Sequence, residues 1–430
     1  MANQVLLRLA KDGAWATPTL DAELKRADLD PRDAGLATEI VYGALRVLPE
    51  LDRRINAHVA RPNKTQPLAL SAMRVAAYQI LHLSRVPVHA AVDEAVRWVR
   101  TQQGPRVGGF VNAVLRKLAT ERPENPEPPQ ELITPRWLQK RIRGSIGDAA
   151  FHQFRSLREM PPPLGIRIVD GTDAEAFADE IRECIPGVEV RSSPWSPQSL
   201  LVRGGSDPRR WPGFSEGRFV VQEQGSQLVG MSAGALKGER ILDACAGRGG
   251  KTLQLLASVG PEGSVVATDI HQHKLDEMGM SLARVGIGTD RLIREAVDLS
   301  VGDGGLQAGF DRILVDAPCT GTGTLHRRPD LMLRLGPRDP QRMASLQLEL
   351  LRRCATLLRA GGQLIYAVCS PLRQEGPDVF EAFLAEHEGM TSRPTALPSA
   401  NLERSPDGSL RLGPWLGELD AYQVFTAQAV

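Results

Sequence analysis

Hydrophobic residues recur every three or four positions through almost all of residues 3–120, as on a helix that buries one face. The spacing is clearest at 69–83 and 89–101. It predicts an all-helical domain at residues 1–120. An acidic, proline-rich run then breaks the pattern, because proline disrupts helices, and predicts a linker at 121–135.

A different pattern follows the linker. A basic amphipathic helix is predicted first, with Arg136, Lys140 and Arg143 on one side. After it we expect a strand, a helix and two further strands, at 161–170, 174–184, 188–190 and 199–202. Residues 136–225 are therefore predicted to form a small α+β region.

Short apolar strands alternate with amphipathic helices from residue 226 to residue 430. The expected strands are 240–244, 264–269, 292–297, 312–316 and 362–368. This alternation predicts a parallel sheet with right-handed crossovers, and ligands of such a sheet lie at the carboxyl ends of its strands. The predicted fold class is multidomain: an all-α N-terminal domain, a small α+β insert and a C-terminal α/β Rossmann-like domain.

Composition narrows the class of protein. With 430 residues, 42% hydrophobic and 24% charged, the chain is typical of a globular protein of two or three domains. It has no apolar run of about 18 residues and no secretory signal at its start, so we expect a cytoplasmic protein with no membrane partner. Five cysteines without a C-x-x-C pair suit a reducing compartment, and no metal site is expected.

The formal charge of +1 hides a local excess of positive residues. Residues 46–120 contain twelve Lys and Arg against four acidic residues. This excess fits a polyanionic partner, provided that the side chains share a face. A solvated helix surface that happens to be basic explains the charge equally well.

A glycine-rich loop follows the first expected strand of the C-terminal domain. That strand leads into Cys245, and Ala-Gly-Arg-Gly-Gly at 246–250 opens a helix at Lys251. Asp269 ends the next strand, where a carboxylate commonly binds ribose hydroxyls, so a nucleoside-containing cofactor is favoured. Asp298, after the third strand, either adds a polar contact or caps the following turn.

A phosphate-loop NTPase is the rival interpretation of the same region. Gly250-Lys251-Thr252, together with the strand ending at Asp316, looks like the two motifs of that class. The NTPase loop, however, needs a glycine five residues before its Gly-Lys pair, and Cys245 occupies that position. The phosphate-binding loop would be incomplete, which argues against an NTPase.

Two further cysteines follow expected strands. Cys319 ends Asp-Ala-Pro-Cys at 316–319, and Cys369 begins Cys-Ser-Pro. Their positions suggest covalent chemistry on a nucleic-acid base, since a thiolate is a strong nucleophile. Unpaired cysteine is also a common small buried hydrophobe, and we assign that role to Cys184 and Cys354.

The ordered motifs at 243–252, 316–323, 327–330 and 366–370 resemble those of S-adenosylmethionine-dependent RNA 5-cytosine methyltransferases. Residues 88–96 and 110–116 resemble the NusB-like domain found in the bacterial ribosomal small-subunit branch of that family. The resemblance implies S-adenosylmethionine as cofactor, small-subunit ribosomal RNA as partner and a monomer. The resemblance further implies that the N-terminal domain and the basic helix are surfaces that position the RNA. The alternatives are a tRNA cytosine-5 methyltransferase and a non-catalytic NusB-like RNA-binding factor.

The resemblance also implies residue roles. Cys369 would add to carbon 6 of cytosine so that carbon 5 can attack the methyl group, Cys319 would assist product release, and Asp316, in its protonated form, would hydrogen-bond to ring nitrogen 3. Arg373 or the helix after Cys369 could favour its thiolate. The implied cofactor-binding residues are Cys245, Ala246, Gly247, Arg248, Gly249, Gly250, Lys251, Asp269, Asp298 and Asp316.

Three features depart from the family pattern. Arg248 stands where the family usually has proline in Ala-Ala-Pro-Gly-Gly, and Gly376 replaces an asparagine that often follows the glutamate. The usual Asp-Gly-Phe-Phe strand near the C-terminus is Asp-Ala-Tyr-Gln-Val-Phe at 420–425. None of the three replaces a residue to which the resemblance gives a catalytic role.

Overall fold

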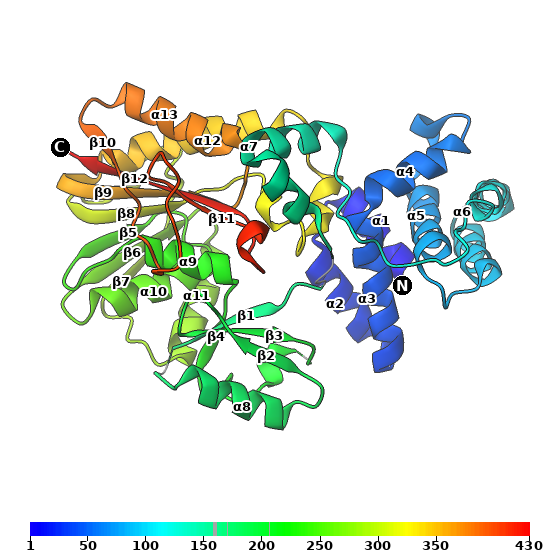
Figure 1. Ribbon diagram of the computed structural model, residues 1–430, viewed down its shortest axis with the longest axis horizontal. Helices are drawn as coiled ribbons and strands as arrows, with labels where there is room; N and C mark the ends of the chain where they lie inside the picture. Colours follow the sequence, from blue (N-terminus) through cyan, green and yellow to red (C-terminus); the bar gives the residue numbers. More distant parts are fainter. Residues whose placement is uncertain (158–160, 170, 206) are drawn as a thin grey trace. The chain divides into compact units, whose positions relative to one another are not determined.

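A computed structural model describes residues 1–157, 161–169, 171–205 and 207–430. The chain divides into two compact units, whose elements are labelled in Figure 1. Unit 1 contains Met1–Lys140, residues 155–157 and Leu325–Gly336. Unit 2 contains Arg141–Phe154, the described part of Pro161–Thr324, and Pro337–Val430.

Unit 1 is helical, as predicted. Its helices are α1 (Ala2–Asp12), α2 (Ala16–Ala27), α3 (Pro31–Arg46), α4 (Leu48–Ala57), α5 (Pro67–His82), α6 (Val88–Ala119) and the start of α7 (Arg136–Arg155), with short 3-10 turns η1 (Pro62–Lys64) and η4 (Pro329–Leu333). Leu45, Leu51 and Leu115 are fully buried in one core to which α1 to α6 all contribute. Helices with one apolar face are stable here because they bury those faces against one another.

A small antiparallel sheet opens the main part of unit 2. It has the order β2-β3-β1-β4 and is covered by α8 (Ala174–Cys184), whose Phe177 and Ile181 are buried against it. Its strands are β1 (Leu164–Ile168), β2 (Glu189–Ser192), β3 (Ser199–Arg203) and β4 (Phe219–Val221), and η2 (Pro208–Arg210) precedes β4. Asp170, the expected end of the first strand, lies outside the described residues.

An eight-stranded sheet forms the centre of unit 2. Its order is β10-β12-β9-β8-β5-β6-β7, with β11 paired to β12. The strands are β5 (Arg240–Asp243), β6 (Ser264–Asp269), β7 (Leu292–Ala296), β8 (Phe310–Asp316), β9 (Leu358–Val368), β10 (Met390–Arg393), β11 (Leu410–Leu412) and β12 (Tyr422–Ala429). The helices are α9 (Gln224–Ser232), α10 (Gly250–Val259), α11 (Gln272–Arg284), α12 (Asp339–Ala355) and α13 (Pro377–Glu386), with turns η3 (Thr322–Thr324), η5 (Arg373–Glu375) and η6 (Pro414–Leu416).

Successive residues of the central strands face opposite helical layers. Leu314 and Ile365 belong to the core beneath α9, α10 and α11, whereas Ile313 and Leu364 belong to the core beneath α12 and α13. Figure 1 shows these two groups of helices on either side of the sheet. Strands buried on both faces are continuously apolar, which is why the sequence predicted them as parallel.

The predicted parallel sheet is confirmed for five strands, β9-β8-β5-β6-β7. The strand expected near the C-terminus, at 420–425, corresponds to β12, which pairs antiparallel with both β9 and β10; β10 and β11 were not predicted. From β5 the sheet is extended on one side by β6 and β7 and on the other side by β8 and β9. The carboxyl ends of β5 and β8 therefore flank a topological switch point, where ligands of such sheets bind.

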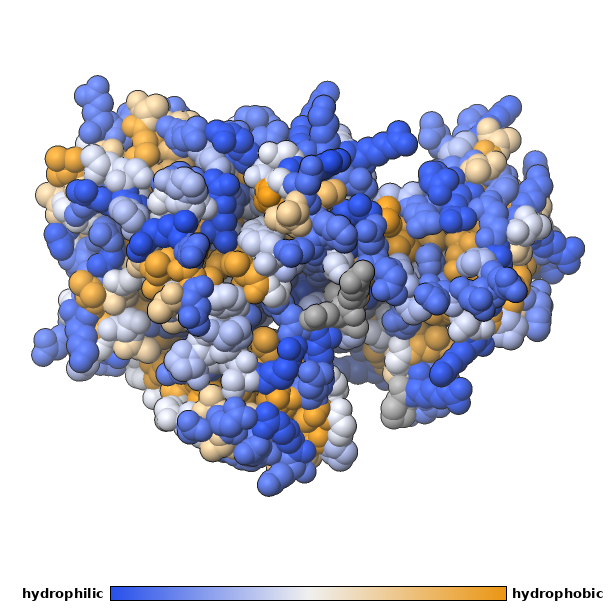
Figure 2. Space-filling view, viewed as in Figure 1, coloured by the Kyte–Doolittle hydropathy of each residue, from blue (hydrophilic) through white to orange (hydrophobic). Residues whose placement is uncertain are grey.

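Hydrophilic residues cover most of the face in Figure 2, and the apolar residues are broken into small patches. Within the described part of the chain, no helix is long and apolar enough to cross a membrane.

Candidate active site

The two catalytic cysteine candidates meet at the ends of neighbouring strands. Cys369 directly follows β9, and Cys319 lies three residues after β8, which pairs with β9 in parallel. Their sulfur atoms are 3.1 Å apart, and both cysteines are free. Parallel strands bring their carboxyl ends to one edge, so residues fifty positions apart reach the same site.

The surroundings of Cys319 keep its thiol protonated. A hydrogen bond to the Cys369 sulfur and burial together raise the pKa of the Cys319 thiol well above its ordinary value. Cys319 therefore keeps its proton near neutral pH. Its thiol can donate to the Cys369 sulfur, 3.1 Å away.

A lysine supplies the positive charge beside them. Lys251, in the first turn of α10, places its Nζ 2.6 Å from Asp316 Oδ2 and 2.9 Å from Ser226 Oγ, and its side chain is 12% exposed. Burial by itself lowers the pKa of Lys251, but the negative charges of Asp316, Asp243 and Cys369 outweigh it, so the net shift is upward. The ammonium is thus held in its charged form against Asp316, at the end of the strand that leads to Cys319.

Arg373, one of the two groups that the sequence offered as favouring the Cys369 thiolate, forms ion pairs with two carboxylates. Its guanidinium lies 2.7 Å from Asp378 and 3.3 Å from Glu381 on α13. The turn after Cys369 is also only the three-residue η5. Lys251, unlike Arg373, forms its ion pair with a predicted site residue, Asp316.

Glu375 joins the two cysteine loops, and the sequence did not single it out. Its fully buried carboxylate accepts hydrogen bonds from the Thr320 amide at 2.7 Å, the Thr320 hydroxyl at 2.5 Å and the Ser370 hydroxyl at 2.7 Å. Burial raises the pKa of Glu375, and these donors partly offset the rise. Because Thr320 follows Cys319 and Ser370 follows Cys369, one carboxylate holds both loops.

Gly323 brings the backbones of the same loops together. Its N–H donates to the Cys369 carbonyl at 3.0 Å, and its own carbonyl accepts from the Ala421 N–H at 3.0 Å. A Cβ atom at residue 323 would lie 2.0 Å from the Ala421 carbonyl oxygen. Glycine is therefore required here by close packing of backbone against backbone.

A pocket of about 340 Å³ opens beside Asp316, across the ends of β5, β6 and β8. Five predicted cofactor residues line it: Cys245, Gly247, Asp269, Asp298 and Asp316. The remaining lining residues are Ala244, Ile270, Lys274, Val297, Leu299, Ser300, Pro318, Leu346 and Leu350. Carboxylates at a switch point with apolar walls suit a nucleoside that carries hydroxyl and cationic groups.

Hydrogen bonds fix the pocket carboxylates. Asp269 accepts from the Gly247 N–H at 3.1 Å and the His271 N–H at 2.9 Å, and Lys274 Nζ lies 3.2 Å away. Asp298 accepts from the Ser300 N–H at 2.9 Å. Asp298 thus both caps its turn and lines the pocket, the two roles that the sequence left open.

The other predicted cofactor residues lie in the same loop but do not line the pocket. Ala246, Gly249 and Gly250 form the turn into α10. Arg248 is exposed and forms an ion pair with Glu277 on α11, which accounts for a charge where the family pattern has proline. A side chain that replaces this proline can therefore point outward from the loop.

Asp243, at the end of β5, supports the glycine loop from beneath. It is buried and accepts a hydrogen bond from the Thr252 hydroxyl of α10 at 2.7 Å. Burial, opposed only in part by Thr252 and Lys251, raises the pKa of Asp243 to about 6. Within the described residues, its Oδ1 has no hydrogen-bond partner.

Comparison with known proteins identifies the family. The model of the 16S rRNA methyltransferase RsmB/F family matches residues 234–428, and that of the NusB family matches residues 1–120. The chain is 30% identical to the probable ribosomal RNA small subunit methyltransferase B of Bacillus subtilis (strain 168) over 415 residues, 94% of this chain and 90% of that protein. It is 32% identical to ribosomal RNA small subunit methyltransferase B of Xanthomonas campestris pv. campestris, over 85% of this chain and 82% of that protein.

Solved structures share the fold. The crystal structure of PH0851 has a TM-score of 0.83 at 24% identity and covers 99% of this chain and 98% of that one. A methyltransferase homologue from Pyrococcus horikoshii has a TM-score of 0.55 at 22% identity and covers 69% of this chain and 100% of its own. From the sequence relatives and the two family matches, we conclude that the chain belongs to the RsmB/F family of 16S rRNA methyltransferases, with a NusB-family domain at its N-terminus.

Proposed function

We propose that the protein transfers a methyl group from S-adenosylmethionine to carbon 5 of a cytosine in 16S ribosomal RNA, through a covalent adduct with Cys369. The observation that carries the proposal is the pair of sulfur atoms, 3.1 Å apart, beside a carboxylate-lined pocket. Asp316, which ends the strand leading to Cys319, is one of the residues that line this pocket. Covalent addition needs one sulfur as nucleophile, and release needs a second group beside it.

The pocket residues fit S-adenosylmethionine. Asp269 stands where the ribose hydroxyls of a nucleoside are commonly bound, and Asp316 faces the pocket from the cysteine side. When bound, this group supplies an electrophilic methyl on a sulfonium. The cationic sulfonium and amino groups suit a site lined by three carboxylates.

The chain's own residues then divide the reaction. The Cys369 thiolate forms a bond to carbon 6, which makes carbon 5 nucleophilic towards the methyl group. Once carbon 5 has taken the methyl group, a base accepts the carbon 5 proton, and the electrons of that C–H bond expel the Cys369 thiolate from carbon 6 and restore the aromatic ring. The protonated Cys319, beside the Cys369 sulfur, is placed to assist that cleavage, because it can supply a proton where the thiolate leaves.

Asp316 enters this scheme with a condition. In the structure its Oδ2 already accepts a hydrogen bond from Lys251 Nζ at 2.6 Å. Donation from a neutral Asp316 to ring nitrogen 3 therefore requires the cytosine to displace or share Lys251. The alternative is that Lys251 itself stabilises negative charge on the base and on Cys369.

The basic helix α7 supports RNA as the substrate. Ser145 of α7 donates to the Pro371 carbonyl at 2.5 Å, two residues after the nucleophile, and the basic Arg141 and Arg143 precede it on the same helix. We propose that this part of α7 positions RNA beside Cys369. A base must leave its stack to reach such a site.

Covalent trapping tests the proposal. Cys319→Ala with S-adenosylmethionine and small-subunit ribosomal RNA should accumulate a protein–RNA adduct that survives denaturation, because addition proceeds and release is impaired. Cys319→Ala/Cys369→Ala should trap nothing. Adduct formation by the double variant would remove Cys369 from the role of nucleophile, and trapping of tRNA alone would keep the chemistry and change the substrate.

A further inference from the structure

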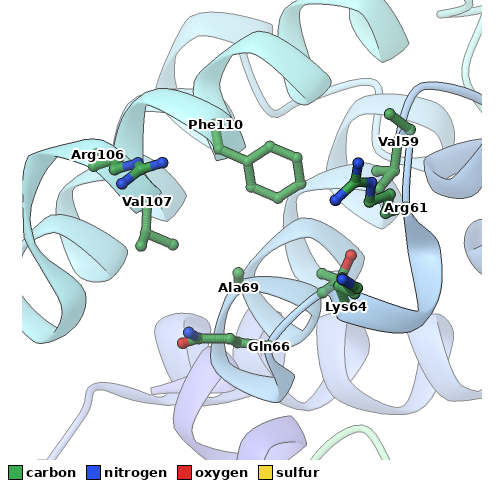
Figure 3. Close-up of a pocket in the computed structure, with 10 residues that line it drawn as sticks. Val59, Arg61, Lys64, Gln66, Ala69, Arg106, Val107 and Phe110 are labelled. Atoms are coloured by element: carbon green, nitrogen blue, oxygen red, sulfur yellow. The ribbon is translucent and has the colours of Figure 1, made fainter.

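A second pocket, of about 420 Å³, lies in unit 1, far along the sequence from the cysteine loops. It is formed by the segment that leads into α5 and by the second half of α6 (Figure 3). Its lining residues are Val59, Ala60, Arg61, Lys64, Thr65, Gln66, Ala69, Arg106, Val107 and Phe110. None of them takes part in the proposed methyl transfer.

A break in α6 creates this pocket. Gly104 has φ 80° and ψ 176°, a conformation that other residues rarely adopt, and Pro105 begins the second half of the helix. The change of direction places Arg106, Val107 and Phe110 opposite the segment before α5. Figure 3 shows the ring of Phe110 projecting between Arg61 and Arg106, with Lys64 and Gln66 below it.

Three positive charges in the pocket are not neutralised. Arg61, Lys64 and Arg106 are exposed, and among the described residues none of them lies within ion-pair distance of a carboxylate. The sequence explains this: residues 53–92 and 95–120 contain no Asp or Glu. Other arginines of this unit, such as Arg54 and Arg74, do have acidic partners. The pocket is therefore complementary to an anion.

An aromatic ring lies among these cations. Phe110 is 37% exposed, and the buried Val59 and Ala69 with the half-buried Val107 give the pocket an apolar floor. A flat apolar surface flanked by guanidinium and ammonium groups matches a nucleotide, whose base can stack while its phosphates meet the cations. The volume lies within the range of about 300–1,000 Å³ for small-molecule sites.

We propose that this pocket binds an unpaired nucleotide of the substrate RNA, with its base on Phe110 and its flanking phosphates on Arg61, Lys64 and Arg106. Single-stranded RNA fits better than a duplex, because a paired and stacked base cannot offer its face to the ring. The inference rests on the proposed function only for the nature of the substrate. It adds a binding site, separate from the cysteine loops, to a domain recognised so far by its family alone.

Binding of a fluorescent, single-stranded oligoribonucleotide of mixed sequence to the full chain tests the proposal. The charge variant is Arg61→Gln/Lys64→Gln/Arg106→Gln. Its matched control is Arg85→Gln/Arg116→Gln/Lys117→Gln, which removes three exposed cations of the same unit that do not line the pocket. The ring variant is Phe110→Leu, which keeps an apolar side chain and removes the stacking surface.

The charge variant should raise the Kd by about tenfold or more at low salt. It should also reduce the slope of log K against log salt by about 2, since each lost phosphate contact removes about 0.7. Phe110→Leu should raise the Kd at least about fivefold and leave the salt slope unchanged. The control triple should weaken binding much less, and the thermal unfolding of all variants should match wild type.

If the charge variant and its control weaken RNA binding equally, the proposal is overturned in favour of a diffuse basic surface. An unchanged Kd in Phe110→Leu would show that no base stacks on this ring. Equal binding of a duplex or of an acidic peptide would show that the pocket is not specific for unpaired RNA. Methyl transfer separates this proposal from the catalytic one. The charge variant should raise KM for RNA with kcat retained; wild type without transferase activity, but with these binding effects, would sink the proposed function alone.

Discussion

Glu375 offers the sharpest test at the scale of single residues. Glu375→Gln keeps the size of the side chain but replaces one acceptor oxygen with a donor that faces the donors of Thr320 and Ser370. We expect kcat to fall by about ten- to a hundredfold, because a small displacement of positioned groups is costly. Cofactor Kd should change little.

Equilibrium binding of the cofactor and single-turnover methyl transfer measure the two effects of Glu375→Gln separately. Glu381→Gln is the matched control, since Glu381 is exposed and its carboxylate forms an ion pair with Arg373 on the surface. Unchanged turnover in Glu375→Gln, or an equal loss in the control, would remove the positioning role.

Asp243 makes stability depend on pH. The pKa of its carboxyl is about 6 in the folded protein, against 3.8 when exposed, so the folded state binds the proton more tightly. Its contribution is most favourable below about pH 4 and is lost as pH rises through 6, by at most about 3 kcal/mol. Relative to Asp243→Asn, wild type should therefore lose thermal stability between these pH values. A difference in Tm that is constant from pH 4 to 7 would contradict this assignment.

Sequence patterns predicted which residues meet at the site better than they predicted how those residues interact. Cys319 and Cys369 were placed at strand ends, and their sulfur atoms lie 3.1 Å apart. Glu375 was missed because its partners Thr320 and Ser370 come from two loops that only the folded sheet brings together. Lys251 was predicted to bind the cofactor, but its ion pair with Asp316 was not predicted, because the two residues are 65 positions apart in the sequence.

At the scale of elements, Gly323 controls how closely the Cys319 loop approaches β12 and Cys369. Gly323→Ala forces a Cβ to within 2.0 Å of a carbonyl oxygen, so the loop must move. We expect a loss of about 1–3 kcal/mol in the free energy of unfolding, typical of overpacking, together with loss of methyl transfer.

Chemical denaturation and transfer of labelled methyl to the RNA measure the two effects of Gly323→Ala. Gly35→Ala is the control, because nothing lies within 4 Å of a Cβ in that helical position and alanine there should stabilise by up to about 1 kcal/mol. Wild-type stability and activity in Gly323→Ala would show that the loops tolerate separation.

Comparison of sequence motifs did not predict how the C-terminal strand packs. Gln423 of β12 donates to the carbonyls of Ser370 and Leu372 at 2.7 and 3.1 Å. A Cβ at residue 376 would lie 2.7 Å from the Gln423 amide, so glycine at 376 and glutamine at 423 accommodate each other. Two departures from the family pattern thus form one packing arrangement, which sequence spacing could not reveal because the residues lie on different elements.

At the scale of the whole molecule, hydrophobic periodicity predicted an all-helical and an α/β part, and both are confirmed. It did not predict that Leu325–Gly336, between the Cys319 loop and α12, belongs to the helical unit. There Asp330 accepts from the Ala16 N–H at 3.4 Å, and the guanidinium of Arg334 lies 3.9 Å from the ring centroid of Trp15. Contacts over more than three hundred positions leave no periodic signal in the sequence.

The measurement that tests the central claim most directly is transfer of labelled methyl from S-adenosylmethionine to small-subunit ribosomal RNA, with the labelled nucleoside identified. Wild type should produce 5-methylcytidine, and Cys369→Ala should produce none while still binding the cofactor. Labelled 5-methylcytidine from Cys369→Ala at the wild-type rate, or label on another atom of the RNA, would contradict a covalent mechanism through Cys369.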